Sequence, residues 1–311
     1  MTLDPHAKRL LEMVAAGGLA PALSEGPDSI RQAMVRLARA VDVRDVPVAS
    51  VEDRHVRRDL PIRVYTPRGA AGRRSGAIVF FHGGVGVFGD LDTHDGLCRM
   101  LADSSDCRVI AVGYRLAPEH PFPAALDDAA FVVEWVWAHA SDLLIERERI
   151  AVAGDSAGGT LAAVVCQGAA RTGGPPIALQ LLLCPVTDVR GGSESRATFA
   201  EGFFIDQRTL EWGRRLAYPP GVDLDDPRVS PLRAPDFSAL PPAHIHTAEF
   251  DPMRDEGKAY ADALLGARVG TVYRCHGGMI HHFYCMAGAI PRARVLVHEV
   301  GAAAGQALRG G

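Results

Sequence analysis

The stretch that decides the fold is Ile150-Ala151-Val152-Ala153-Gly154-Asp155-Ser156-Ala157-Gly158-Gly159-Thr160. Its first four residues are apolar and long enough for a buried strand, and an apolar-rich helical pattern follows over residues 161–170. A serine on a sharp strand-to-helix turn exposes its hydroxyl, and glycines fit two residues before and after it because side chains would collide there. The helix that begins at Ala157 directs unpaired backbone N–H groups at negative charge beside Ser156. The stretch therefore predicts a serine nucleophile.

The Gly-x-Ser-x-Gly pattern by itself is weak support for this prediction. In a chain of 311 residues with 33 glycines, it arises by chance in roughly one sequence in seven. The alternative is a glycine-rich turn in which Ser156 only caps the helix. The flanking strand and helix favour the nucleophile, and an oxyanion hole, an acid and a base elsewhere in the chain would decide between the two.

The composition is typical of a globular enzyme with one large domain or two unequal ones, since 48% of the residues are hydrophobic and 23% are charged. A net charge of −4 and a pI of about 6.3 indicate binding neither to nucleic acid nor to an anionic membrane surface. The cysteines lie singly, mostly in apolar segments, which favours buried free thiols over a disulfide framework. They are Cys98, Cys107, Cys166, Cys184, Cys275 and Cys285.

The N-terminus faintly imitates a signal peptide, because Lys8 and Arg9 precede a stretch of small residues. However, Asp4 and Glu12 flank the basic pair and two glycines interrupt the stretch, so we expect a cytoplasmic protein. No apolar run approaches the roughly 20 residues of a membrane span.

Alternating strands and helices predict a mostly parallel, doubly wound α/β sheet in two parts of the chain, residues 46–186 and 233–311. The first part begins with two strands, at 48–54 and 62–66, whose alternating pattern is typical of half-exposed antiparallel edge strands. Continuous apolar runs such as 77–81 are typical of central strands buried on both faces.

Two segments lie outside this alternation. Residues 1–45 carry helical spacing without a strand pattern and are expected to form a helical appendage. Residues 187–232 hold a glycine pair, several aromatic residues and one short amphipathic helix near 207–218, so we interpret them as an insertion into the sheet-forming part of the chain.

The end of the strand at 77–81 carries a candidate oxyanion hole. In open α/β sheets the reactive groups lie at the carboxyl ends of strands. There, glycines let backbone N–H groups approach a developing negative charge. We therefore predict that Gly83, Gly84 and Ala157 donate to the oxyanion. The alternative is a glycine-rich exit that only makes a tight turn.

The candidate acid is Asp251, which follows the strand at 243–248. Glu249 is its closest rival, but Asp251 lies beyond the strand end, where a loop can carry it to a histidine. Asp255 and Glu256 lie inside the next helix, where a solvated or salt-bridged face is expected.

The candidate base is His281, in the region that follows the last strand at 271–275. His282 is second and His276 third, because two adjacent histidines cannot both face the serine and the other would line the pocket. The chain order of serine, acid and histidine is the one expected of the α/β-hydrolase fold.

A competing interpretation treats the cysteines and histidines near the C-terminus as metal ligands. Their spacing matches no zinc-finger or HExxH pattern, so no metal is expected. The residues concerned are Cys275, His276, His281, His282 and Cys285.

Five stretches, in order along most of the chain, resemble the hormone-sensitive-lipase family of esterases, the bacterial group called family IV. They are His82-Gly83-Gly84 with Gly89-Asp90-Leu91-Asp92-Thr93-His94, then Tyr114-Arg115-Leu116-Ala117-Pro118-Glu119, Gly154-Asp155-Ser156-Ala157-Gly158-Gly159, Asp251-Pro252-Met253-Arg254-Asp255-Glu256 and Gly278-Met279-Ile280-His281.

The resemblance implies an α/β-hydrolase fold with a helical cap, whose two parts would be residues 1–45 and 187–232. It also implies a serine carboxylesterase that hydrolyses short-to-medium acyl esters of small molecules without a cofactor, with Ser156, Asp251 and His281 as its triad. A homodimer through the edge strand of the sheet is common in this family.

The chain departs from the family at one place. Members carry His-Gly-Gly-Gly followed by Trp or Phe, whereas this chain has Val85 and Gly86 after the second glycine. Val85 can still supply its backbone N–H, and Gly86 is expected to widen the pocket beside the nucleophile. Val85, Gly86, Phe203 and His282 are the predicted pocket residues.

Two other functions stay open. An amide or lactam hydrolase, or an acyltransferase, would use the same triad, because the leaving-group preference depends on the shape of the pocket. A non-catalytic small-molecule binder on this scaffold, as in the plant gibberellin receptors that resemble the family, is less favoured because those proteins lack the triad histidine.

Overall fold

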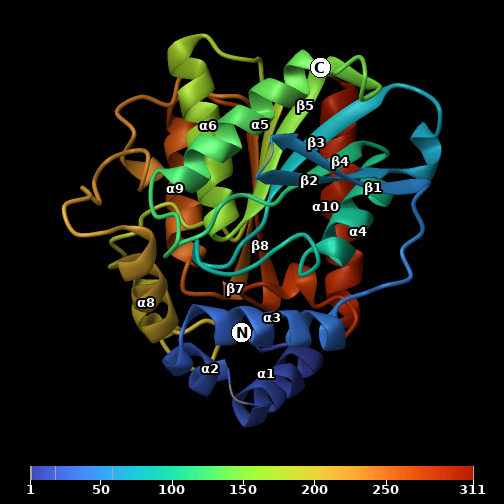
Figure 1. Ribbon diagram of the computed structural model, residues 1–311. Coiled ribbons are helices and arrows are strands. Elements are labelled where there is room, and N and C mark those ends of the chain that lie inside the picture. The colour runs from blue at the N-terminus through green and yellow to red at the C-terminus, as the bar shows by residue number, and fades with distance from the viewer. Residues whose placement is uncertain (1, 18, 58, 311) are drawn as a thin grey trace.

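A sheet with strand order β1-β2-β4-β3-β5-β6-β7-β8 forms the centre of the computed structural model, which describes residues 2–17, 19–57 and 59–310 (Figure 1). The strands from β3 to β8 run parallel to one another, with β4 beside β3. The strands are β1 (Ser50–Arg57), β2 (Leu60–Thr66), β3 (Ser75–Phe81), β4 (Arg108–Val112), β5 (Ile145–Asp155), β6 (Leu179–Leu183), β7 (Ala243–Phe250) and β8 (Thr271–Ile280). The predicted parallel α/β sheet is confirmed.

Helices cover both faces of this sheet, as Figure 1 shows. One face packs on α4 (Asp95–Ser105) and α10 (Pro291–Arg309), and the other on α5 (Ala124–Ala138), α6 (Ala157–Thr172) and α9 (Arg254–Gly266). The central strands β3 and β4 are buried along their whole length, as their continuous apolar sequences predict.

The two strands predicted at the antiparallel edge differ from each other in position. β1 is the edge strand and pairs with β2 in antiparallel register, with Ser50 opposite Thr66. β2 is largely buried, because its other side pairs with β4, also antiparallel. The prediction of a half-exposed edge strand is therefore right for β1 and wrong for β2.

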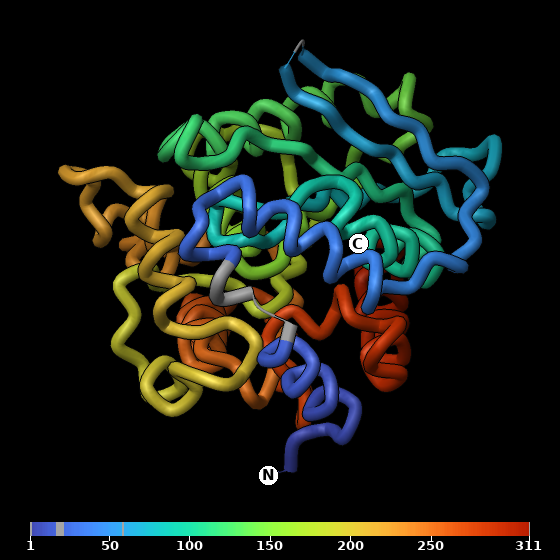
Figure 2. Tube along the Cα trace, turned by 60° about the horizontal axis from the view of Figure 1, so that its bottom comes forward, coloured from blue at the N-terminus to red at the C-terminus, as the bar shows by residue number. Residues whose placement is uncertain are grey.

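Helices from the two segments outside the alternation lie at one end of the molecule (Figures 1 and 2). The N-terminal segment supplies α1 (Pro5–Gly17), α2 (Leu19–Glu25) and α3 (Pro27–Val41). The later segment supplies α7 (Glu194–Thr198), which the sequence pattern did not predict, and α8 (Gln207–Ala217). An apolar cluster joins them: Ile30 and Met34 of α3 pack with Val87 and Phe88 of the core, and Trp212 of α8 packs against the same cluster.

Polar contacts also hold α3 on the core. Arg31 donates hydrogen bonds to the carbonyls of Val87 and Ala117, at 2.9 Å each, and forms an ion pair with Glu119. Because Glu119 is exposed, the carbonyl contacts contribute most of this attachment. The α3 helix is thereby fixed over the carboxyl ends of the central strands.

Two further expectations concern the whole chain. All six cysteines are free, and five are buried, whereas Cys275 is exposed on the edge strand β8. Among the described residues, the helices include none that combines the length and the apolar character required to cross a membrane.

Candidate active site

The strand β5 and the helix α6 meet at Ser156, which adopts a positive φ of 53°. A Cβ atom at position 154 would lie 2.2 Å from the carbonyl oxygen of Gly158, and one at position 158 would lie 2.0 Å from that of Phe81. Both positions therefore require glycine, because the backbone of the turn and of the neighbouring strand β3 leaves no room for a side chain. This is the strained turn that the sequence predicts.

Three loops bring Ser156, Asp251 and His281 into one hydrogen-bonded row. The Nε2 atom of His281 lies 3.1 Å from the Oγ atom of Ser156, and its Nδ1 atom lies 2.9 Å from Oδ2 of Asp251. All three side chains are buried. The second carboxylate oxygen, Oδ1, accepts the backbone N–H of Met253 at 2.8 Å, which fixes the orientation of the carboxylate. Such a row suits proton transfer from the serine to the imidazole.

The rivals of Asp251 have other partners. Oε2 of Glu249 accepts the backbone N–H of Gly278 at 2.7 Å. Glu256 is buried rather than solvated and forms an ion pair of 2.9 Å with Arg196, an arginine of the 187–232 segment. Its role is to attach that segment to α9.

The backbone N–H groups near Ser156 differ from the predicted oxyanion hole at one position. The N–H of Gly83 donates to Oδ1 of Asp155 at 2.8 Å, so this donor is already engaged. In the described part of the chain, no hydrogen bond uses the N–H of Gly84, Val85 or Ala157. Gly84 and Val85 have positive φ values of 121° and 49°, which turn this loop sharply. The assignment of Gly83 is therefore corrected, and Val85 is the better candidate.

The carboxylate of Asp155 contacts the N–H of Gly83 and two histidine rings, a role that the sequence did not predict. Its Oδ1 lies 3.2 Å from Nε2 of His94, and its Oδ2 lies 3.4 Å from Nδ1 of His282. Burial alone would raise the pKa of Asp155, but the two imidazoles outweigh burial and hold this pKa below its usual range. Asp155 thus fixes the Gly83 loop and both histidines around Ser156.

The other histidine of the C-terminal group has a separate environment. His276 belongs to β8, which extends to Ile280, and its Nε2 lies 3.1 Å from Nδ1 of His246 on β7. Burial lowers the pKa of His276 to about 4, so the ring is neutral at physiological pH. The structure therefore separates His276 and the exposed Cys275 from the other residues of the metal-ligand interpretation.

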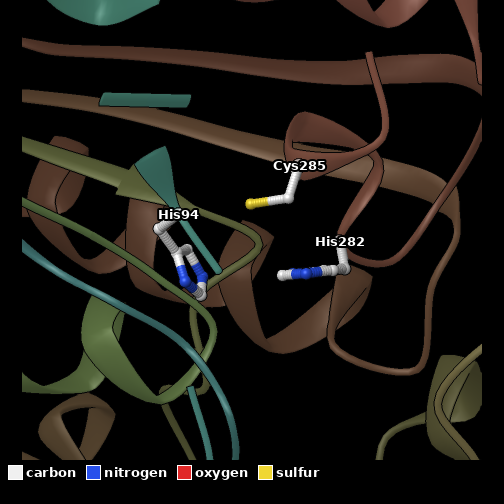
Figure 3. Close-up of side chains that lie close together, drawn as sticks. All are labelled: His94, His282 and Cys285. Carbon is white, nitrogen blue, oxygen red and sulfur yellow. The ribbon is translucent and has the colours of Figure 1, made fainter. Parts of the chain in front are cut away.

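Two groups of side chains in the described chain have the donor atoms to hold a metal ion. The first is Cys184, Asp251 and His281, of which Asp251 and His281 already hydrogen-bond to each other. The second is His94, His282 and Cys285, shown in Figure 3. Sequence reasoning missed His94 as a partner, because it is nearly 190 positions away from the other two in the chain.

A cavity of about 490 Å³ opens beside Ser156 and His281. Among the predicted pocket residues, Val85 and His282 line it. Its other walls come from both outlying segments and from the core. The lining residues of these segments include Leu11, Val14, Leu23, Ile30, Met34, Leu37, Phe204, Ile205, Arg208 and Thr209.

The two other predicted pocket residues lie elsewhere. Phe203 stacks on Phe250 and does not line this cavity, whereas its neighbour Phe204 faces it and stacks on His282 with a ring separation of 5.6 Å. Gly86 lines a smaller cavity of about 60 Å³. Gly86 therefore does not line the large cavity, and its expected widening of the space beside Ser156 stays a prediction.

Comparison with known proteins identifies the family. Residues 78–285 match the sequence profile of a family described by its alpha/beta hydrolase fold. The chain is 45% identical to the carboxylic ester hydrolase LipN of Mycobacterium tuberculosis over 231 residues, which cover 72% of this chain and 61% of LipN. It is 37% identical to the esterase LipI of the same organism, over 94% of this chain and 91% of LipI.

A solved structure shows the same architecture over nearly the whole chain. The ester hydrolase EH1AB1 from the metagenome of Lake Arreo, solved with a bipyridine phosphonate derivative, superposes with a TM-score of 0.94. The two chains are 37% identical, and the superposition covers 98% of this chain and 99% of that one. The chain therefore belongs to the α/β-hydrolase fold family and, within it, to the hormone-sensitive-lipase group of esterases.

Proposed function

We propose that this protein is a serine carboxylesterase in which Ser156, His281 and Asp251 form the catalytic triad. The observation that carries the proposal is the row in which His281 lies 3.1 Å from the serine oxygen and 2.9 Å from the carboxylate. The names of its relatives LipN and LipI, an ester hydrolase and an esterase, support the same reaction class.

The reaction follows from the roles of these atoms. Nε2 of His281 takes the proton of the Ser156 hydroxyl as the oxygen attacks the ester carbonyl, and the imidazolium then protonates the departing alcohol. Water activated by the same nitrogen attacks the acyl-enzyme and releases the acid. Asp251 holds the imidazole in the tautomer that leaves Nε2 free to accept a proton, and it stabilises the imidazolium.

The oxyanion of each tetrahedral intermediate is held by the backbone N–H groups of Gly84, Val85 and Ala157. These donors border the nucleophile and have no other partner among the described residues. Losing one such donor typically raises the barrier by about 2.7–4 kcal/mol. The side chain of Val85 is not needed for this role, because only its N–H donates.

The substrates that fit best are esters of small molecules with short-to-medium acyl chains. The cavity of about 490 Å³ has the size of a small-molecule site and is walled largely by apolar side chains of residues 1–45 and 187–232. We infer that these two segments act together as a cap that shields the acyl-enzyme from bulk water and limits the length of the substrate.

The test uses p-nitrophenyl esters of graded chain length, from acetate to palmitate, with an anilide series beside them. We expect turnover of the shorter esters, weak turnover of palmitate and much slower cleavage of the anilides. Faster cleavage of the anilides than of the matched esters would favour an amide hydrolase instead.

The nucleophile is tested by Ser156→Ala, with Ser238→Ala as a matched control at an exposed serine outside the cavity. Ser156→Ala should lose ester turnover and labelling by a fluorophosphonate while its thermal unfolding stays that of the wild type. Ser238→Ala should keep all three properties. Turnover that survives in a folded Ser156→Ala protein would refute the assignment.

A further inference from the structure

The side chains of His94, His282 and Cys285 point toward a common space (Figure 3), and all three line the cavity beside Ser156 and His281. One ring nitrogen of each histidine and the Sγ atom of Cys285 all lie within 4.8 Å of one another. His94 precedes α4, while His282 and Cys285 flank the short turn after β8, so only the folded chain assembles the group. None of the three takes part in the proposed proton transfer.

The donor set determines which ion it would suit. Two imidazoles and one thiolate match zinc and other thiophilic cations, and they match neither magnesium nor calcium, which prefer oxygen ligands. Zinc bonds of about 2.0–2.3 Å in a tetrahedral site place neighbouring ligand atoms about 3.3–3.8 Å apart. Since the donor atoms lie within 4.8 Å of one another, side-chain rotations that shorten their separations by at most about 1–1.5 Å would suffice.

The surroundings of the group favour a cation. The carboxylate of Asp155 lies 3.4 Å from Nδ1 of His282, as a carboxylate does behind a metal-bound histidine, which leaves Nε2 of this ring for an ion. Nε2 of His94 lies 3.2 Å from the same carboxylate and its Nδ1 lies 3.0 Å from Oγ1 of Thr93, so the ring must leave one of these contacts when it binds an ion.

We propose that His94, His282 and Cys285 bind a thiophilic divalent cation such as Zn²⁺, with the thiol proton of Cys285 released to solvent, and that the bound ion inhibits the esterase. All three residues line the cavity that also holds Ser156 and His281, so an ion has a path from solvent and would stand in the space of the substrate. Three protein ligands leave a fourth position open toward the cavity. The inhibitory part rests on the proposed esterase function, whereas the binding part does not.

Binding is measured directly on the full-length protein after treatment with a chelator. Equilibrium dialysis with Zn²⁺ should give one ion per chain, and titration with Cd²⁺ should produce the ultraviolet absorption of a cadmium–thiolate bond. Cys285→Ser and His282→Gly should each weaken Zn²⁺ binding by about tenfold or more. Glycine is a safe replacement at 282 because this residue has a φ of 65°. Cys275→Ser, at the exposed cysteine, is the matched control and should bind as the wild type does.

Inhibition is measured as the ratio of ester turnover with and without Zn²⁺ for each variant, so that altered basal rates cancel. The wild type and Cys275→Ser should be inhibited over the concentration range in which the site fills, and Cys285→Ser should resist. Unchanged Zn²⁺ binding in Cys285→Ser and His282→Gly, or no binding by the wild type, would overturn the site. A filled site with unaltered turnover would overturn the inhibitory role. A protein without any ester turnover would refute the proposed esterase function, and the dialysis result would then still decide whether the metal site exists.

Discussion

Helix α8 touches the proposed oxyanion loop where Gly213 faces Val85. A Cβ atom at position 213 would lie 2.5 Å from Cγ2 of Val85, 2.6 Å from its Cβ and 3.2 Å from its carbonyl oxygen. Carbon atoms pack best at about 3.5–4.0 Å, so Gly213→Ala must displace Val85 by about 1 Å. Gly213 is buried in the middle of the helix, whereas Val85 borders the cavity, so the loop that carries Val85 is the element that yields.

The expected size of the effect follows from this displacement. Moving a group that positions the reacting atoms by about 1 Å can cost about 100-fold in rate, or about 2.7 kcal/mol, which equals the lower end for the loss of one oxyanion donor. We therefore expect kcat to fall by about two orders of magnitude with little change in KM. Overpacking costs about 1–3 kcal/mol of stability, and alanine regains about 1 kcal/mol over glycine in a helix, so the variant should remain folded.

The assay combines steady-state kinetics on a short p-nitrophenyl ester with thermal unfolding and a fluorophosphonate titration of competent sites. Gly168→Ala is the matched control, because this position also lies in a helix and a Cβ there meets no atom within 4 Å. Adding Val85→Gly to Gly213→Ala removes the colliding side chain and keeps the N–H, so most of the lost rate should return. The predicted displacement of Val85 is refuted if Gly213→Ala keeps more than about a third of the wild-type kcat, or if the double variant is as slow as the single one.

Three further predictions concern the attachment of the outlying segments and the response to pH. Arg196→Met leaves the buried Glu256 without its cation and should lower the free energy of unfolding by about 3–5 kcal/mol in urea titrations. Adding Glu256→Gln should recover part of this loss, because it removes the unpaired buried charge. A loss below about 1 kcal/mol in Arg196→Met would contradict the prediction. Arg31→Ala removes two hydrogen bonds to core carbonyls as well as the ion pair with Glu119, so it should raise KM several-fold more than it lowers kcat, and a pure kcat effect would speak against the cap. Burial raises the pKa of Asp42 to about 6 from its ordinary 3.8, so the folded state holds this proton more tightly than the unfolded state does. The proton therefore contributes at most about 3 kcal/mol to the free energy of unfolding. This contribution is present below about pH 4 and is lost as the pH rises through 6. Asp42→Asn should remove this part of the pH dependence in denaturant titrations at about pH 4 and pH 7, and an unchanged difference between the two would exclude the assignment.

Local signals in the chain predict the positions of the strands and the order of the triad. The turn at Ser156 can be predicted because a buried strand, the serine and an adjoining helix are consecutive in sequence. Gly154 and Gly158 are required there by contacts within that turn or with its neighbouring strand. Asp251 can be predicted because it directly follows a strand, at the carboxyl ends of the strands where the reactive groups of this class of fold lie.

The corrected assignments at the site depend on the direction in which a backbone or side chain points. A glycine pattern does not reveal that the N–H of Gly83 is taken by Asp155, nor that Phe204 faces the cavity while Phe203 packs on the core. Neighbouring residues in a loop point in different directions, and one backbone torsion decides which of them reaches the site.

By itself, then, the sequence determines the α/β architecture and predicts the nucleophile and the serine–acid–histidine order, because those depend on short-range periodicity, turn chemistry and the alternation of elements. Tertiary structure decides which N–H groups are free beside Ser156, which side chains wall the cavity, and that His94 meets His282 and Cys285. These contacts join residues far apart in the chain, and their geometry is set by how helices pack across a sheet edge, which no local pattern of residues records.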